Sequence, residues 1–189
     1  MPAIELRPGF FMFAIVLAAL DRSGSVLPIL CAMAVHELAH IVMMLACGGQ
    51  VRRLTLRFAD FQIAASGLGY RQELLSALAG PLVNLICGAA FCMQRPSFAA
   101  YSLMLGIYNL LPVWPLDGGR MIRCVLLARL PITQAEHISE IVSFAACAVL
   151  LLIGVFLTFF RKSGLWPLGT AAYLTVRLLM LARRTDTVQ

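Results

Sequence analysis

The chain has 189 residues, of which 61% are hydrophobic and 13% are charged. A soluble domain carries about 25% charged residues, so this composition predicts an integral membrane protein and argues against an ordinary soluble enzyme. The formal net charge of +6 fits the basic loops that membrane proteins keep on the cytoplasmic side. Because no basic and aromatic patch accompanies the charge, we expect no nucleic-acid partner.

Six apolar stretches are candidates for membrane spans, since a span needs roughly 20 apolar residues and fewer when the helix is broken or re-entrant. In chain order, they are residues 9–20, 25–46, 74–93, 98–111, 138–160 and 165–181. We expect the first stretch to remain in the mature protein, because Asp21-Arg22 follows it instead of a small-residue cleavage site. The fifth is preceded by a capping-box pattern from Thr133 to Glu136, after the helix breaker Pro131.

The segment "VRRLTLRFADFQIAASG" differs from these spans, because apolar and polar residues alternate in it. Alternation with a period of two is typical of a strand, and Ala59-Asp60 lies near a turn. We therefore expect a small β-hairpin over Val51 to Ala65 at the membrane surface. The predicted fold is an all-α polytopic bundle of about six transmembrane helices with this membrane-associated hairpin, in one domain covering residues 1–189.

Six spans would place both termini on the same side of the membrane. That side receives most of the arginines, whereas the other receives only Arg22, Arg95, Arg161 and Lys162. The positive-inside rule makes the arginine-rich side cytoplasmic. No organelle signal is evident, so we expect a bacterial cytoplasmic membrane with both termini in the cytoplasm.

The second span contains the pattern His36-Glu37-x-x-His40. Histidines four residues apart lie on one face of a helix, so both imidazoles can bind one metal ion. Glu37 can then reach a water at the metal and act as general base, as in zinc hydrolases. The alternative is a pair of core histidines with a buried glutamate partner, but ionisable groups inside a membrane generally mark function. The third histidine, His137, is expected at the surface.

A catalytic zinc site takes three protein ligands, and Asp117 in "NLLPVWPLDGGR" is the preferred third ligand. It follows the fourth span, on the side of the membrane where the second span ends. Pro112 and Pro115 would stop the helix, and Gly118-Gly119 would permit a sharp bend, so the aspartate could return toward the histidines on irregular backbone. The other acidic candidates are Asp60, Glu73 and Glu140.

At this point the sequence resembles the site-2 protease family of intramembrane zinc metalloproteases, peptidase family M50. The resemblance rests on "HELAH", on "NLLPVWPLDGG" and on "AGPLVN" in the third span, and it covers nearly the whole chain. The six-span form is most similar to the sporulation-type branch, that of the stage IV FB protein. That branch often carries a C-terminal nucleotide-binding CBS domain, and we expect neither this domain nor a PDZ insertion here.

The resemblance implies that His36, His40 and Asp117 hold one Zn²⁺ and that Glu37 is the catalytic base. It also places Asn84 and Asn109 at the substrate cleft. From the residues alone, each asparagine is a lone amide in an apolar helix, which could equally hold helices together or orient the substrate and stabilise an oxyanion.

The activity implied is cleavage of a membrane-tethered protein within or near its transmembrane segment, with a pro-sigma or anti-sigma factor as candidate substrates. We expect the lipid bilayer and that substrate as partners, and a regulatory membrane protein is a further candidate. Two rival functions are a metal transporter, which would need a path of polar residues across the membrane, and a catalytically inactive binding or chaperone scaffold.

Overall fold

The computed structural model describes residues 3–6, 21, 24–57, 60–160 and 165–186. The first predicted span, residues 9–20, lies outside them. The chain divides into two compact units, Met1–Asn109 and Leu110–Gln189, and each is described by itself. The single-domain organisation therefore stays a prediction.

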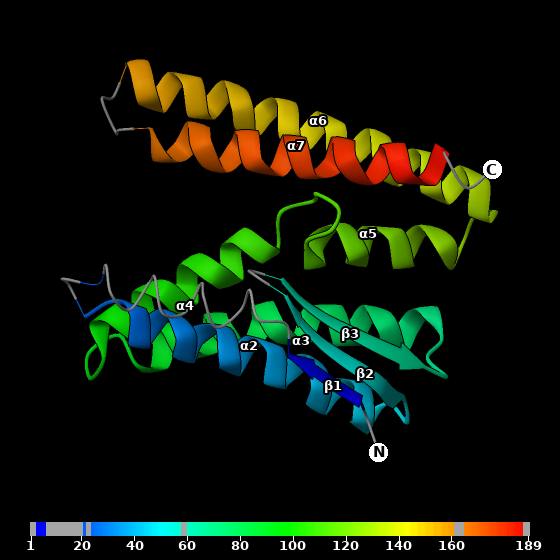
Figure 1. Cartoon of the computed structure of the whole chain (residues 1–189), viewed down its shortest axis with the longest axis horizontal. Helices are drawn as coiled ribbons and strands as arrows, with labels where there is room; N and C mark the ends of the chain where they lie inside the picture. Colours follow the sequence, from blue (N-terminus) through cyan, green and yellow to red (C-terminus); the bar gives the residue numbers. More distant parts are fainter. Residues whose placement is uncertain (1–2, 7–20, 22–23, 58–59, 161–164, 187–189) are drawn as a thin grey trace. The chain divides into compact units, whose positions relative to one another are not determined.

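Three helices form the body of the first unit: α2 (Val26–Ala46), α3 (Tyr70–Ala90) and α4 (Pro96–Asn109). They pack against one another (Figure 1). Buried residues recur every fourth position on α2, from Ala32 to Met44, and on α3, from Ser76 to Gly88. Residues four apart share one helix face, so each helix presents a continuous seam to its neighbours.

Small residues bring these helices close together. A side chain at Gly88 of α3 would collide with Leu103 of α4, and one at Gly106 of α4 would approach the Pro81 carbonyl to 3.0 Å. Close backbone approach through small residues is how apolar helices associate in a membrane, where lipid tails give no hydrophobic drive between them.

The same unit carries a three-stranded sheet in the order β1-β2-β3. Strands β2 (Gln50–Arg57) and β3 (Asp60–Ser66) pair antiparallel, and β1 (Ala3–Leu6) pairs parallel with β2. The segment predicted as a hairpin thus forms two paired strands, and β2 is the central strand. Its association with a membrane surface stays a prediction.

The second unit consists of α5 (Asp117–Leu127), α6 (Ile132–Phe159) and α7 (Trp166–Asp186). Helix α6 packs against α5 and α7. It buries the small residues Ala135, Ser139, Ser143 and Cys147 along one face, and the rest of its surface exposes large apolar side chains such as Leu152 and Phe156. An apolar outer surface on a long helix is typical of a membrane span.

The helical fold predicted from the sequence is confirmed for the described residues, although the helix ends differ by up to six residues. Within the described residues, α2, α3 and α6 are long and apolar enough to cross a membrane, so the protein is an integral membrane protein. Helix α4 has only 14 residues, and this agrees with the short fourth span expected from the sequence.

Two local expectations were wrong. Thr133 does not begin a capping box, because α6 starts at Ile132 with Pro131 as its N-terminal cap and no side-chain capping bond. Gly118 and Gly119 do not form a bend on irregular backbone; they lie in the first turn of α5, a helix that was not predicted. Gly118 is needed there because a side chain would collide with the preceding backbone carbonyls of Leu110 and Leu111.

Candidate metal centre

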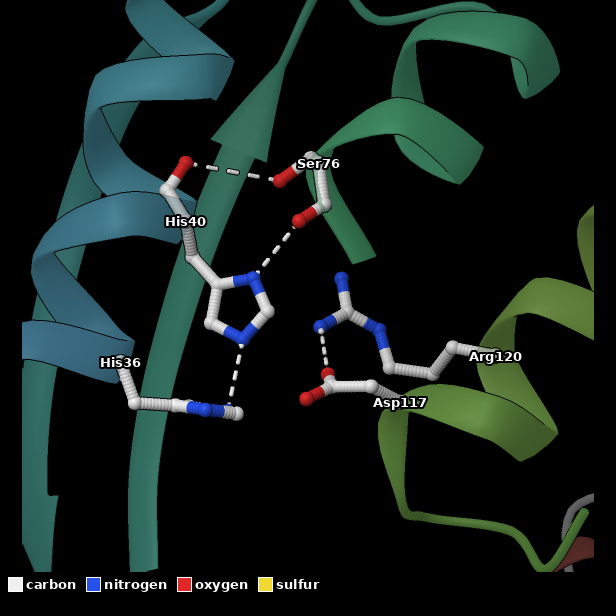
Figure 2. Close-up of polar contacts among 5 residues, drawn as sticks. All are labelled: His36, His40, Ser76, Asp117 and Arg120. Atoms are coloured by element: carbon white, nitrogen blue, oxygen red, sulfur yellow. Dashed lines mark hydrogen bonds and ion pairs between the residues drawn. The ribbon is translucent and has the colours of Figure 1, made fainter. Parts of the chain in front are cut away.

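His36 and His40 meet on the buried face of α2. Their Nε2 atoms lie 3.1 Å apart, and the rings are nearly perpendicular, at 84° (Figure 2). The side chains are almost fully buried, with exposed fractions of 4% and 3%. Helical spacing therefore places both rings on one face of α2, as the sequence predicted, and their Nε2 atoms face each other.

The backbone carbonyl of Ser76 fixes the tautomer of His40. The Nδ1 atom of His40 lies 2.7 Å from this carbonyl oxygen on α3 (Figure 2). A carbonyl oxygen can only accept, so Nδ1 carries the hydrogen, and in the neutral ring Nε2 keeps its lone pair. This is the arrangement in which histidine binds a metal through Nε2.

Asn84 of α3 contacts the other histidine. Its Nδ2 atom lies 3.1 Å from Nδ1 of His36, and the side chain is fully buried. Its Oδ1 atom is buried as well and has no hydrogen-bond partner within the described part of the chain. Asn84 therefore contacts the outer nitrogen of His36, as the Ser76 carbonyl contacts that of His40.

Gly80 leaves room for the two rings. A Cβ atom at this position would overlap Nε2 of His40 and would come within 2.9 Å of Cε1 of His36. Ser76, Gly80 and Asn84 are four residues apart, so they form one face of α3 directed at the histidines. Of these three, sequence reasoning selected only Asn84, although the four-residue spacing was visible.

Glu37 follows His36 on α2 and is half-buried. Asn109, at the end of α4, donates a hydrogen bond from Nδ2 to the Leu105 carbonyl within its own helix, and its place at a substrate cleft stays a prediction. His137 is exposed on α6, as expected.

Asp117 belongs to the second unit, where it is the first residue of α5 and is buried. Its Oδ1 atom accepts a hydrogen bond from Nη1 of Arg120 at 3.3 Å (Figure 2). The preceding loop is anchored to α6, because the Trp114 amide donates to Oγ of Ser143 at 3.0 Å. Sequence reasoning missed Arg120, which lies one helical turn beyond Asp117 and can neutralise its buried carboxylate.

Zinc fits the groups that the first unit offers. Zn²⁺ prefers imidazole nitrogen and carboxylate oxygen, and the two Nε2 atoms already face each other across the space beside Gly80. Catalytic zinc sites use three protein ligands, so the two imidazoles would need one further ligand.

Comparison with known proteins points to one family. The model of "Peptidase family M50" matches residues 91–153. A zinc metalloprotease of Methanocaldococcus jannaschii is 27% identical over 172 residues, which cover 80% of this chain and 51% of the relative. Stage IV sporulation protein FB of Bacillus subtilis is 25% identical over 169 residues, covering 82% of this chain and 58% of the relative. The chain is similar to both relatives over about four fifths of its own length.

The solved site-2 protease from Methanocaldococcus jannaschii has the same fold. It matches with a TM-score of 0.67 at 20% identity, over 94% of this chain and 89% of the solved chain. The resemblance read from "HELAH" and "NLLPVWPLDGG" is therefore confirmed. The chain spans little more than half the length of the two relatives compared by sequence.

Replacing Gly80 with alanine tests whether the space beside the two imidazoles is a metal site. The added methyl group would displace the His40 ring, and we expect zinc affinity to fall about tenfold or more, as when ligand orientation is disturbed. Competition with a chromophoric chelator measures the affinity. Gly88→Ala, two turns further along α3, would crowd Leu103 and the Ala99 carbonyl of α4 but not the imidazoles. It therefore controls for disturbed helix packing and should bind zinc as the wild type does. Equal affinities for all three proteins would contradict the assignment.

Proposed function

We propose that the protein is an intramembrane zinc metalloendopeptidase, with His36, His40 and Asp117 as zinc ligands and Glu37 as general base. The proposal rests chiefly on the Nε2 atoms of His36 and His40, which lie 3.1 Å apart on the buried face of the apolar helix α2. The half-buried Glu37 is the next residue after His36. The similarity of the chain to a zinc metalloprotease and to a solved site-2 protease supports the same activity. Two buried imidazoles and a carboxylate are costly at membrane depth, so a function is the default explanation.

Bound zinc would supply Lewis acidity for the peptide carbonyl and would lower the pKa of a water toward about 7. The chain itself supplies the proton transfers. A carboxylate oxygen of Glu37 takes the proton from the attacking water and then gives it to the nitrogen of the departing amine. The Ser76 carbonyl keeps the His40 ring in its metal-binding orientation throughout, because its hydrogen bond lies on the side of the ring away from Nε2.

Hydrolysis requires water, so the site must reach an aqueous space although its helices are apolar. We propose that this space opens to the cytoplasm, in a bacterial cytoplasmic membrane with both chain termini on that side. The arginine distribution along the sequence supports this orientation. Irregular backbone such as residues 110–116 is tolerated at membrane depth where it is buried or lines a watery cavity.

The substrate would be a membrane-tethered protein, and its scissile segment must leave its own helical hydrogen bonds to be cut. We propose that this extended segment pairs with β3, as in strand addition. Strand β2 is already paired on both sides, by β1 and β3, so β3 offers the outer edge of the sheet. Pro and Gly in the substrate would favour this unwinding. Pro-sigma and anti-sigma factors are candidate substrates, and a regulatory membrane protein is a candidate partner.

The two rival functions predict different measurements. A transporter would carry metal across proteoliposomes, and the described residues offer one histidine pair instead of a polar path through the membrane. An inactive scaffold would bind a partner without cleaving it, but the chain retains Glu37 together with both histidines and Asp117.

Glu37→Gln separates metal binding from chemistry. The amide cannot accept the proton, so we expect about one zinc per chain but cleavage of a membrane-tethered reporter reduced about 100-fold or more. Zinc and cleavage are measured on the same detergent preparation. Glu140→Gln, exposed on α6, is the matched control and should cleave normally. Full activity of Glu37→Gln would contradict its role as base, and wild-type protein without zinc after chelator-free purification would mean that the ligands are misassigned.

Asp117→Ala tests the third ligand. Loss of a ligand should lower zinc affinity by more than about 100-fold, beyond the 10- to 100-fold typical of residues that only orient a ligand. Arg120→Gln is the matched control, because it removes the ion-pair partner of Asp117 and leaves the carboxylate. If both variants bound zinc as tightly as the wild type, another acidic residue would have to be the ligand.

Proline substitution in β3 tests strand addition. Backbone N–H groups on an antiparallel edge strand alternate between the paired and the outward side, so Gln62→Pro and Ile63→Pro remove one of each. We expect the substitution on the outward side to lower cleavage of a tethered helical reporter while zinc content stays unchanged. A rate unaffected by either substitution would rule out pairing of the substrate with β3.

A further inference from the structure

Asn84 offers two different hydrogen-bonding atoms to a single partner. Its side chain is fully buried, so water does not compete for the contact with His36. The amide nitrogen lies 3.1 Å from Nδ1 of His36, and the amide oxygen has no partner within the described part of the chain. Leaving a buried carbonyl oxygen unpaired is unfavourable, so the arrangement calls for an explanation.

The hydrogens along this chain of contacts follow from the atom types. The Ser76 carbonyl places a hydrogen on Nδ1 of His40, so Nε2 of that neutral ring is an acceptor. His36 can then donate from its own Nε2 across the 3.1 Å contact. With Nε2–H present, Nδ1 of His36 carries a lone pair, and this lone pair accepts the hydrogen from Nδ2 of Asn84. Each contact therefore has one donor and one acceptor.

This pattern of hydrogens is not compatible with metal binding at both rings. A ring that binds a metal through Nε2 must carry its hydrogen on Nδ1. The Nδ1–H of His36 would then face the N–H of Asn84, which is a contact between two donors. Rotating the amide by half a turn removes the conflict, because its oxygen and nitrogen have nearly the same shape and the oxygen then accepts from Nδ1–H.

We infer that Asn84 is a positioning residue that holds His36 in its metal-binding tautomer by turning its amide oxygen toward Nδ1–H. The inference rests on the proposed function, because it takes Nε2 of His36 as a zinc ligand. The sequence placed Asn84 at the substrate cleft, whereas this inference assigns it the orientation of the His36 ring through Nδ1. The two histidines would then be oriented by different acceptors, a backbone carbonyl for His40 and a side-chain amide for His36.

Substitutions at position 84 separate the role of Asn84 as a hydrogen-bond acceptor from its role as a donor. Aspartate keeps the acceptor and cannot donate when ionised, whereas leucine has a similar shape and neither function. We expect Asn84→Leu to lower zinc affinity about 10- to 100-fold and Asn84→Asp to stay within about threefold of the wild type. Chelator competition on the full chain in detergent gives these affinities. Ser102→Ala, which removes another fully buried polar group in the same unit, is the control and should match the wild type.

Nitrogen-15 NMR of labelled histidine gives a readout independent of cleavage, since the chain has only 3 histidines. His137→Gln removes the signals of the exposed ring. We expect His36 to carry Nε2–H in the metal-free wild type and Nδ1–H in the zinc-loaded wild type and Asn84→Asp proteins. The aspartate variant also keeps the test decisive if the leucine variant does not fold.

Two results would overturn the inference: zinc affinity in Asn84→Leu equal to that of the wild type, or an equal fall in Asn84→Asp and Asn84→Leu. The second result would mean that Asn84 acts as a donor. A wild-type chain that binds no zinc would instead overturn the proposed function, and this inference with it. The zinc content of the wild type is therefore measured before any variant is compared.

Discussion

The hydrogen bond from the His40 imidazole to the Ser76 carbonyl is the contact on which the site depends. It joins residues 36 positions apart in sequence and requires α2 and α3 to approach closely. It also decides which nitrogen of His40 faces inward. In an apolar surrounding, an imidazole N–H without an acceptor is costly, so this bond lowers the cost of burying the histidine and directs its free nitrogen at the same time.

Close approach of the two helices in turn determines which residues α3 can carry. The face toward the histidines presents a serine, a glycine and an asparagine at four-residue intervals. Gly80 cannot carry even a methyl group without meeting the rings. The seam between α2 and α3 therefore combines small size with hydrogen-bonding capacity, whereas α6 buries small residues where it packs against its neighbours without a comparable histidine pair.

The sequence predicted those parts of the structure that follow from local spacing. His36 and His40 share a face because any helix places residues four apart together, and the long apolar runs of α2, α3 and α6 indicate spans by length alone. Helix α5 was missed because its 11 residues, starting Asp-Gly-Gly-Arg, resemble a turn in composition. Pro131 caps α6 two residues before the expected cap, Thr133, because the fixed φ angle of proline suits the start of a helix.

Tertiary contacts account for the rest of what could not be predicted. No local rule states that the carbonyl of Ser76 will face His40, or that Asn84 will contact Nδ1 of His36. These contacts depend on how two helices distant in sequence are rotated about their axes, and spacing within each helix leaves that rotation open. The ion pair between Asp117 and Arg120 could have been found from its three-residue spacing once α5 was known to be a helix.

The separation in sequence between α2 and its partners has a consequence for biosynthesis. Helix α2 precedes Ser76, Gly80 and Asn84 in the chain, so its imidazoles are synthesised before the groups that orient them. Until α3 packs against α2, the nascent chain lacks the contacts that orient both rings. Orientation of the histidine pair is therefore tied to the insertion of α3 and to its packing against α2.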